Sequence, residues 1–261
     1  MNKNKRPYFL VLFLFGSIML TACVEPPQPI NWSSAEDDST FGEIDEGGDI
    51  IEGGGVSDTT ENEAPIIKNY DAVHPAPGTT KTSRGWPVDA PLNSSPSDRH
   101  PELYGEVLDQ FAVANNPRYD PNARGTMCNI FVWDATRAMG AEIPHWVDKN
   151  GNPMPPASAG AYELNANKTV TWLRNNGSQQ GWQKVSANEA AQMAQAGHPV
   201  VAGWENLDGN KIGHVAMVRP ESTANNLIVA QAGGVNTNSS KISDRFSEAY
   251  RDGEIEYYVH E

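Results

Sequence analysis

The sequence is poor in cysteine and in paired metal ligands. Its 261 residues contain only two cysteines, Cys23 and Cys128, and six histidines, none of which has another histidine at the i, i+4 spacing. A zinc site built from thiolates needs several cysteines, and histidine ligands on a helix commonly recur at that spacing. We therefore expect no metal ion and no other cofactor.

Positive charge is also scarce. The chain has 19 Lys and Arg residues against 33 Asp and Glu residues, which gives a formal net charge of −14 at pH 7. The sequence contains no basic cluster that would neutralise phosphates, so we expect no nucleic-acid partner. Residues 24–65 carry 12 acidic residues and no Lys or Arg, whereas residues 66–261 carry 21 acidic and 16 basic residues. The acidic excess therefore lies mainly in the N-terminal segment.

Long apolar runs are lacking apart from the one between Phe9 and Leu20, which is shorter than the roughly 20 residues that a membrane-spanning helix needs. Three basic residues precede this run, a pattern typical of a secretory signal. The following Leu-Thr-Ala-Cys sequence resembles the lipobox of bacterial lipoproteins, which implies that Cys23 receives a diacylglyceryl group. We expect residues 1–22 to be the signal peptide. The mature protein would then sit in the cell membrane or the outer membrane through its lipid, facing the periplasm or the exterior. The alternative is an ordinary secretory signal that contains a cysteine.

Composition divides the remaining chain into three parts. Residues 23–65 are acidic and glycine-rich, so we expect a disordered tether. Residues 66–100 are rich in Pro, Ser, Thr and Asn, which favours an irregular arm wrapped around the domain. Residues 101–261 are numerous enough for one domain with its own core, and we expect a monomer.

Hydrophobic periodicity predicts helices first and strands afterwards in residues 101–261. The expected helices are 101–115, 126–139, 167–175 and 186–196, the last with a capping box of Ser186 and Glu189. The expected strands are 199–204, 214–218, 227–231 and 254–259, the first three forming an antiparallel meander. This order predicts the α+β class, with a helix packed on an antiparallel sheet.

Cys128 is the only thiol left once Cys23 is assigned to lipid. A leftover thiol in an exported protein is an inert buried residue, an intermolecular link or a nucleophile. Cys128 follows Thr126, the expected N-cap, so it falls in the first turn of a helix. Unpaired backbone N–H groups there favour the thiolate, which predicts a lowered pKa and also part of an oxyanion hole.

Two residues on the expected strands complete a catalytic hypothesis. His214 opens a strand after a glycine and shares a face with Ala216 and Val218, so we expect its side chain to point toward the Cys128 helix and to act as base. The alternative for His214 is a core histidine. Gln231 ends the next strand and is placed to orient the imidazole, although it would also fit as a strand cap.

The order of Cys128 on a helix start, then Gly213-His214-Val-Ala-Met-Val, then Gln231 resembles the papain-like amidohydrolases of the CHAP and NlpC/P60 group over residues 100–261. The resemblance implies a papain-like cysteine hydrolase in which Cys128 and His214 form the catalytic pair and Gln231 is the third residue. It also implies an amidase or endopeptidase that cleaves peptidoglycan. The sequence departs from the NlpC/P60 pattern, since Met-Cys-Asn replaces Asp-Cys-Ser-Gly, and from CHAP domains, which usually carry an acid or Asn as third residue.

Other functions stay open on the same residues. One is a non-catalytic wall-binding lipoprotein with a degenerate papain-like domain, and another is acyl transfer through the same thioester. Tyr119 and Trp146 are candidate substrate-binding residues, with aromatic packing and loop anchoring as their alternatives. Asp134, six residues after Cys128 and nearly on the opposite helix face, is not expected to be catalytic.

The lipobox resemblance predicts that Cys23→Ser moves the protein from the membrane fraction to the soluble exported fraction. Removing the acceptor sulfur removes the acyl chains that hold the chain at the bilayer. Fractionation followed by immunoblotting measures this, and a variant that stays with the membrane would exclude the lipid anchor.

Overall fold

The structure is a computed structural model that describes residues 74–75, 84–121, 126–208 and 211–261. The expected signal peptide (1–22), the lipidation site Cys23 and the expected tether (23–65) lie outside the described residues. Within the described ranges, none of the helices combines the length and the apolar character that a membrane span requires.

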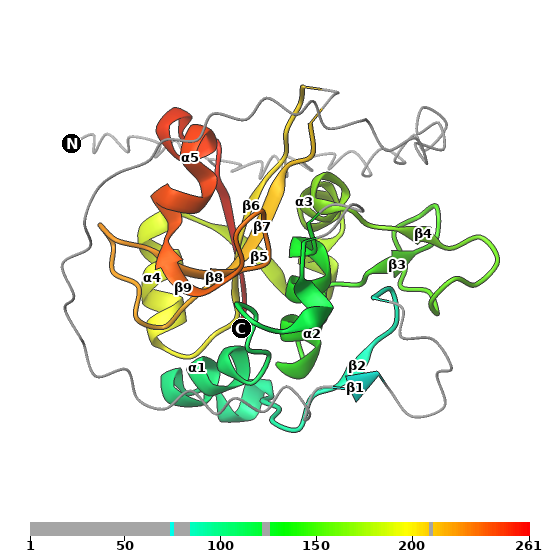
Figure 1. The fold of residues 1–261 in the computed structure, drawn as a ribbon, viewed down its shortest axis with the longest axis horizontal. Helices are drawn as coiled ribbons and strands as arrows, with labels where there is room; N and C mark the ends of the chain where they lie inside the picture. Colours follow the sequence, from blue (N-terminus) through cyan, green and yellow to red (C-terminus); the bar gives the residue numbers. More distant parts are fainter. Residues whose placement is uncertain (1–73, 76–83, 122–125, 209–210) are drawn as a thin grey trace, which may run out of the picture.

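The centre of the domain is a six-stranded antiparallel sheet with the strand order β5-β10-β6-β7-β8-β9 (Figure 1). Its strands are β5 (Trp182–Val185), β6 (Val200–Trp204), β7 (His214–Val218), β8 (Ile228–Gln231), β9 (Thr237–Lys241) and β10 (Glu256–His260). Two smaller two-stranded ladders pair β1 (His74–Pro75) with β2 (Val88–Asp89) and β3 (Trp146–Val147) with β4 (Tyr162–Glu163). The predicted meander is confirmed, since β6, β7 and β8 pair consecutively and antiparallel.

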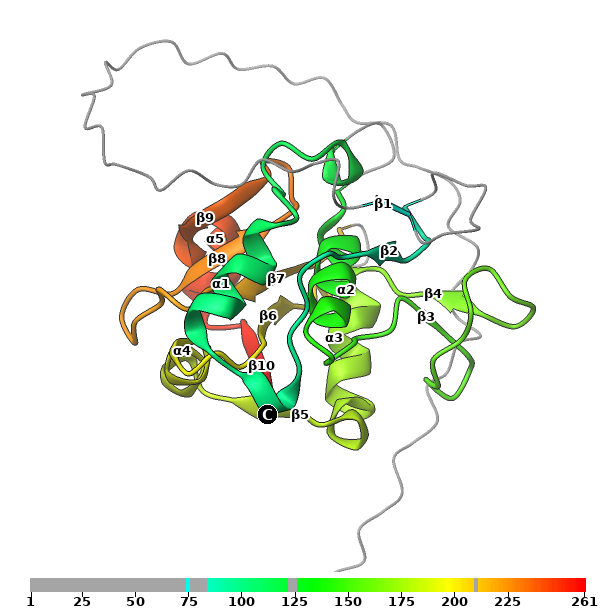
Figure 2. The ribbon, with the colours of Figure 1, turned by 90° about the horizontal axis from the view of Figure 1, so that it is seen from below.

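Helices cover both faces of this sheet. The described ranges contain α1 (Pro101–Asp109), α2 (Cys128–Ala138), α3 (Ala166–Asn175), α4 (Ala187–Gln195) and α5 (Ile242–Asp252). Short 3-10 turns cover Pro96–Asp98, Pro117–Tyr119 and Gly177–Gln180. Figures 1 and 2 show α2 and α3 on one side of the sheet and α4 and α5 on the other. The α+β class with an antiparallel sheet is therefore confirmed.

The two covered faces explain why the middle strands are apolar. Every residue of β6 is buried except Trp204, and every residue of β7 is buried except His214. Gly203 of β6 has no side chain because Val170 of α3 lies against it; an added Cβ would meet the Val170 Cγ2 atom at 2.8 Å. Close packing of α3 on β6 thus depends on that glycine.

Several boundaries differ from the sequence predictions. The first helix ends at Asp109 rather than near Asn115, because the chain turns at Ala112, whose φ is 44°. Thr126 is not the N-cap of α2; Met127 is, and it makes no side-chain cap. The capping box of α4 is confirmed, with Ser186 and Glu189 bonded to each other's backbone N–H groups.

Residues 84–100 of the N-terminal arm pack against α2. The Val88 carbonyl accepts from Arg137 Nη1 at 2.7 Å, and the Ser94 N–H donates to the Ala138 carbonyl at 2.9 Å. The arm therefore holds the C-terminal end of the helix that begins at Cys128.

A buried polar network ties the same arm to the middle of α2. Arg118 Nε lies 2.6 Å from Asp134 Oδ2, and these side chains are 10% and 1% exposed. The Tyr119 hydroxyl donates to the same Asp134 oxygen at 2.8 Å. Arg118 Nη2 also donates to the carbonyls of Arg84 and Trp86. Asp134 is therefore held by structural partners, on the face of α2 that points away from the Cys128 thiol.

Removing one partner of this network leaves a buried, uncompensated charge. We expect Asp134→Ala to lower the free energy of unfolding by about 3–5 kcal/mol, because the Arg118 guanidinium loses its counter-ion. Tyr119→Phe, which deletes only a hydroxyl, should cost about 1 kcal/mol. Urea unfolding of the two variants measures both values, and equal losses would contradict the assignment of the ion pair as the dominant contact.

Candidate active site

Cys128 is the first residue of α2 and lies against the backbone of β7. The helix packs on β7, and the thiol is 2% exposed. The sulfur is within hydrogen-bonding reach of the Val215 backbone and of the Thr126 side chain. The Val215 N–H is open to this contact because β8 ends at Gln231 and does not pair that far along β7.

The predicted lowering of the Cys128 pKa is wrong. Burial raises the pKa of the thiol above its ordinary value, and the hydrogen bonds from Val215, Thr126 and the start of α2 only reduce that rise. A charge inside the domain loses its hydration, and the field of a helix terminus does not replace that loss here. The thiol is therefore protonated at neutral pH.

His214 begins β7 directly beside Val215. Strand alternation puts its side chain on the sheet face shared with Trp204 and Gln231. The centroid of the imidazole ring lies 4.8 Å from the centroid of the Phe246 ring of α5. Burial lowers the pKa of His214 to about 4, and the interaction with the Gln231 side chain opposes that shift. The imidazole is therefore neutral at pH 7 and able to accept a proton.

One nitrogen of this imidazole has no partner. Nε2 of His214 is buried, and no described residue forms a hydrogen bond with it. A buried polar atom without a partner costs roughly 1–3 kcal/mol, and such atoms are uncommon in folded proteins. Seven other buried side-chain atoms of the described residues also have no partner, among them Nδ1 of His198 and of His260, so the free nitrogen by itself does not mark His214 as functional.

Gln231 lies next to His214 as the sequence suggested. It ends β8, is 2% exposed, and its Nε2 donates to the Val235 carbonyl. This bond fixes the amide group of Gln231. The Gln231 side chain that faces His214 is therefore held in place by the loop that follows β8.

The thiol and the imidazole are not bonded to each other. No hydrogen bond joins Cys128 to His214 within the described residues, and the imidazole contacts Phe246 of α5, which lies across the sheet from α2 in Figure 1. The expectation that the His214 side chain points toward the Cys128 helix is therefore not met. The structure brings the two residues to the same end of β7 through Val215.

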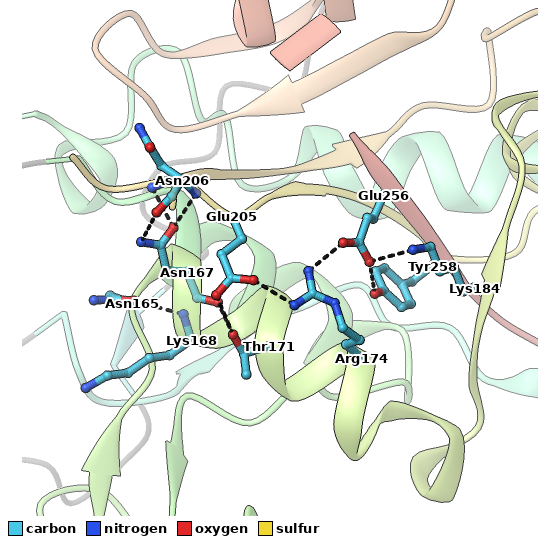
Figure 3. Close-up of polar contacts among 11 residues, drawn as sticks. Asn165, Asn167, Lys168, Thr171, Arg174, Lys184, Glu205, Asn206, Glu256 and Tyr258 are labelled. Atoms are coloured by element: carbon cyan, nitrogen blue, oxygen red, sulfur yellow. Dashed lines mark hydrogen bonds and ion pairs between the residues drawn. The ribbon is translucent and has the colours of Figure 1, made fainter. Parts of the chain in front are cut away.

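Asn167, at the start of α3, binds the backbone of the loop that leads into His214. Sequence reasoning did not identify this residue. Its Oδ1 accepts from the N–H groups of Gly213 at 2.8 Å and Asn206 at 2.9 Å, and its Nδ2 donates to the Asn206 carbonyl (Figure 3). An added Cβ on Gly213 would meet the Trp204 carbonyl at 2.0 Å. The glycine before His214 signalled a close approach, but nothing in the sequence pointed to its partner.

Tyr119 and Trp146 both have structural partners. Tyr119 is fully buried and its hydroxyl is bound to Asp134, so the geometry supports the packing alternative. The half-buried Trp146 donates from Nε1 to the Gly85 carbonyl at 2.8 Å, which anchors its loop to the arm. It also lines a cavity of about 100 Å³ together with Trp133 and His145.

The described residues contain no group of three or more His, Cys, Asp or Glu side chains that could hold a metal ion. No protein-family model matches the sequence. No curated protein matches it at a significant level.

The lowered pKa of His214 predicts a stability change with pH. Its folded value near 4 lies below the ordinary 6.5, so the unfolded chain binds more protons between these values and the fold loses stability as the pH falls from 7 to 4. This loss is about 3 kcal/mol at most. We expect His214→Gln to flatten that part of the profile, measured by urea unfolding at several pH values. His100→Gln, at an exposed histidine, is the control and should keep the wild-type slope.

Proposed function

We propose that this protein is a cysteine-dependent hydrolase of amide bonds in peptidoglycan, acting as an amidase or endopeptidase with a papain-like arrangement of Cys128 and His214. The observation that carries the proposal is the position of a neutral His214 one residue from Val215, whose backbone contacts the Cys128 sulfur at the start of α2. A neutral imidazole at the same end of β7 as a thiol at a helix start is compatible with nucleophilic catalysis.

The raised pKa of the thiol and the lowered pKa of the imidazole specify how the attack would run. Both groups are neutral at rest, so the Cys128 thiol gives its proton to His214 as the sulfur adds to the substrate carbonyl carbon. Backbone N–H groups at the start of α2 stabilise the oxyanion. The intermediate collapses to a thioester as His214 protonates the leaving amine, and water then releases the acid and restores the thiol.

This chemistry requires the imidazole to leave its contact with Phe246, since no bond to the thiol exists in the described structure. His214 projects from the face of β7 opposite to α2, so a movement of the backbone at the start of β7 is needed to bring Nε2 toward the sulfur. Gln231 is a positioning residue in this scheme, because it interacts with the imidazole from the neighbouring strand.

The choice of peptidoglycan rests on the resemblance of the Cys128, His214 and Gln231 segments to CHAP and NlpC/P60 enzymes and on the expected lipid anchor at Cys23. An exported enzyme held on a membrane by lipid meets the cell wall as its nearest amide-rich polymer. The lack of a basic cluster is compatible with that partner.

A second function is favoured by a separate observation. The thiol is 2% exposed and has no hydrogen bond to His214, which is what a domain without turnover would show. In this alternative the protein is a wall-binding lipoprotein that holds peptidoglycan without cleaving it.

Mass spectrometry of fragments released from purified peptidoglycan distinguishes the two. We expect new fragments with the wild-type protein and a loss of at least about 100-fold with Cys128→Ala and with His214→Ala, because each removes a group that takes part in every turnover. His198→Ala is the control, since His198 precedes β6 at the opposite end of the sheet. Full activity in the Cys128→Ala protein would exclude the hydrolase, and retention on the wall without products would support the binding module.

A further inference from the structure

The guanidinium of Arg99 has no counter-ion among the described residues. Its Nη1 donates to the Met139 carbonyl at 2.7 Å, at the end of α2, and lies 3.4 Å from the Ser94 hydroxyl. Its Nε and Nη2 atoms are buried and form no hydrogen bond with any described residue. The neighbouring carboxylate, that of Asp98, accepts hydrogen bonds from Ser95 instead. A permanently charged group therefore holds two donor atoms in the protein without an acceptor, which costs more than an unpartnered neutral atom.

Two more unpartnered nitrogens lie beside Arg99. Nε1 of Trp182 and Nδ1 of His260 are buried and form no hydrogen bond with a described residue. Trp182 is 1% exposed, and its ring centroid lies 5.5 Å from that of His260 on the neighbouring strand. Burial lowers the pKa of His260, and the positive charge of Arg99 lowers it further. Four of the eight unpartnered buried side-chain atoms of the described residues thus belong to these three residues.

Segments that are distant in sequence bring the three residues together. An added Cβ on Gly197 would overlap the His100 backbone, so the residue after Arg99 packs against the turn that precedes β6. The His260 N–H donates to the Pro199 carbonyl in the same turn at 3.1 Å. Figures 1 and 2 both draw the C-terminus, one residue beyond His260, close to the segment that leads into α1. The group therefore lies where β6 begins, at the opposite end of the sheet from the candidate active site.

Two other arginines show what the free side of Arg99 is suited to bind. The side chains of Arg118 and Arg219 are 10% and 6% exposed. Arg118 binds the Asp134 carboxylate through Nε at 2.6 Å and Nη2 at 2.9 Å. Arg219 binds the Glu221 carboxylate through the same two nitrogens, each at 3.0 Å. These atoms share one side of the planar guanidinium and match the two oxygens of a carboxylate. Arg99 has this same side free.

Charge and burial restrict the chemistry of the occupant. A buried charge is stabilised by an opposite charge, so the occupant is an anion. One guanidinium balances one negative charge, which favours a carboxylate over a phosphate ion. Both nitrogens are closed off from solvent, which favours a small acid over a bulky ligand.

We propose that Nε and Nη2 of Arg99 bind the carboxylate of a small aliphatic acid, of the size of acetate, beside Trp182 and His260. The bound acid neutralises the cation at which residues 94–99 meet the end of α2. The site is separate from Cys128 and His214, so the proposal does not depend on the proposed hydrolase.

NMR titration of the full-length protein tests this proposal with acetate and acetamide, each labelled with carbon-13 at the carbonyl carbon. Acetamide has the size of acetate without its charge. We expect the acetate resonance to shift and broaden on binding and the acetamide resonance to stay unchanged. Arg99→Lys keeps the positive charge but loses the two parallel N–H groups, so it should weaken acetate binding by about tenfold or more.

A matched control separates the site from general positive charge. Arg251 is exposed on α5, which lies across the sheet from α2, and Arg251→Lys should change the affinity by less than about twofold. Acetate binding that Arg99→Lys leaves intact, equal binding of the two probes, or no binding of acetate would each overturn the proposal. Displacement of acetate by chloride or phosphate at equal affinity would overturn the carboxylate assignment. The comparison of the two probes uses only the wild-type protein, so it decides the question even where Arg99→Lys fails to fold.

Discussion

The close contact between the start of α2 and the backbone of β7 determines the rest of the site. It exists because β8 stops at Gln231, which leaves the Val215 backbone unpaired on that side and open to the Cys128 sulfur. The sheet therefore supplies a hydrogen-bonding group at the place where the helix presents its first residue. The arm along α2 and the Arg118–Asp134 pair keep the helix in this position.

Burial removes water from both groups, from Cys128 between α2 and β7 and from His214 against Phe246 of α5. Desolvation disfavours the charged form of any group, so it raises the pKa of the Cys128 thiol and lowers that of the His214 imidazole. These opposite shifts have one cause, and together they disfavour a resting thiolate–imidazolium pair. The proposed reaction therefore has to begin with proton transfer between two neutral groups, so it depends more on where the imidazole lies than on the basicity of the imidazole in water.

The sequence predicted those elements whose signals are local. The capping box of Ser186 and Glu189 marked α4, and the apolar runs marked β6, β7 and β8. The strand β9 escaped because its residues, Thr237–Lys241, include no large apolar group. Helix α5 was missed although its buried residues, Ile242, Phe246 and Ala249, recur at the i, i+4, i+7 spacing of a helix face. The hydrogen bonds of Asn167 to the β6–β7 loop and the raised pKa of Cys128 both depend on tertiary packing. A rule based only on the position of a cysteine at the start of a helix does not include that packing.

The unpredicted helix α5 lies against the candidate active site. Phe246 packs on the His214 imidazole, and the next residue, Ser247, has a φ of 22°, a strained backbone conformation for a residue with a side chain. The proposed pairing of His214 with Cys128 has to break the contact between the imidazole and Phe246, so the position of α5 bears on whether that pair can form.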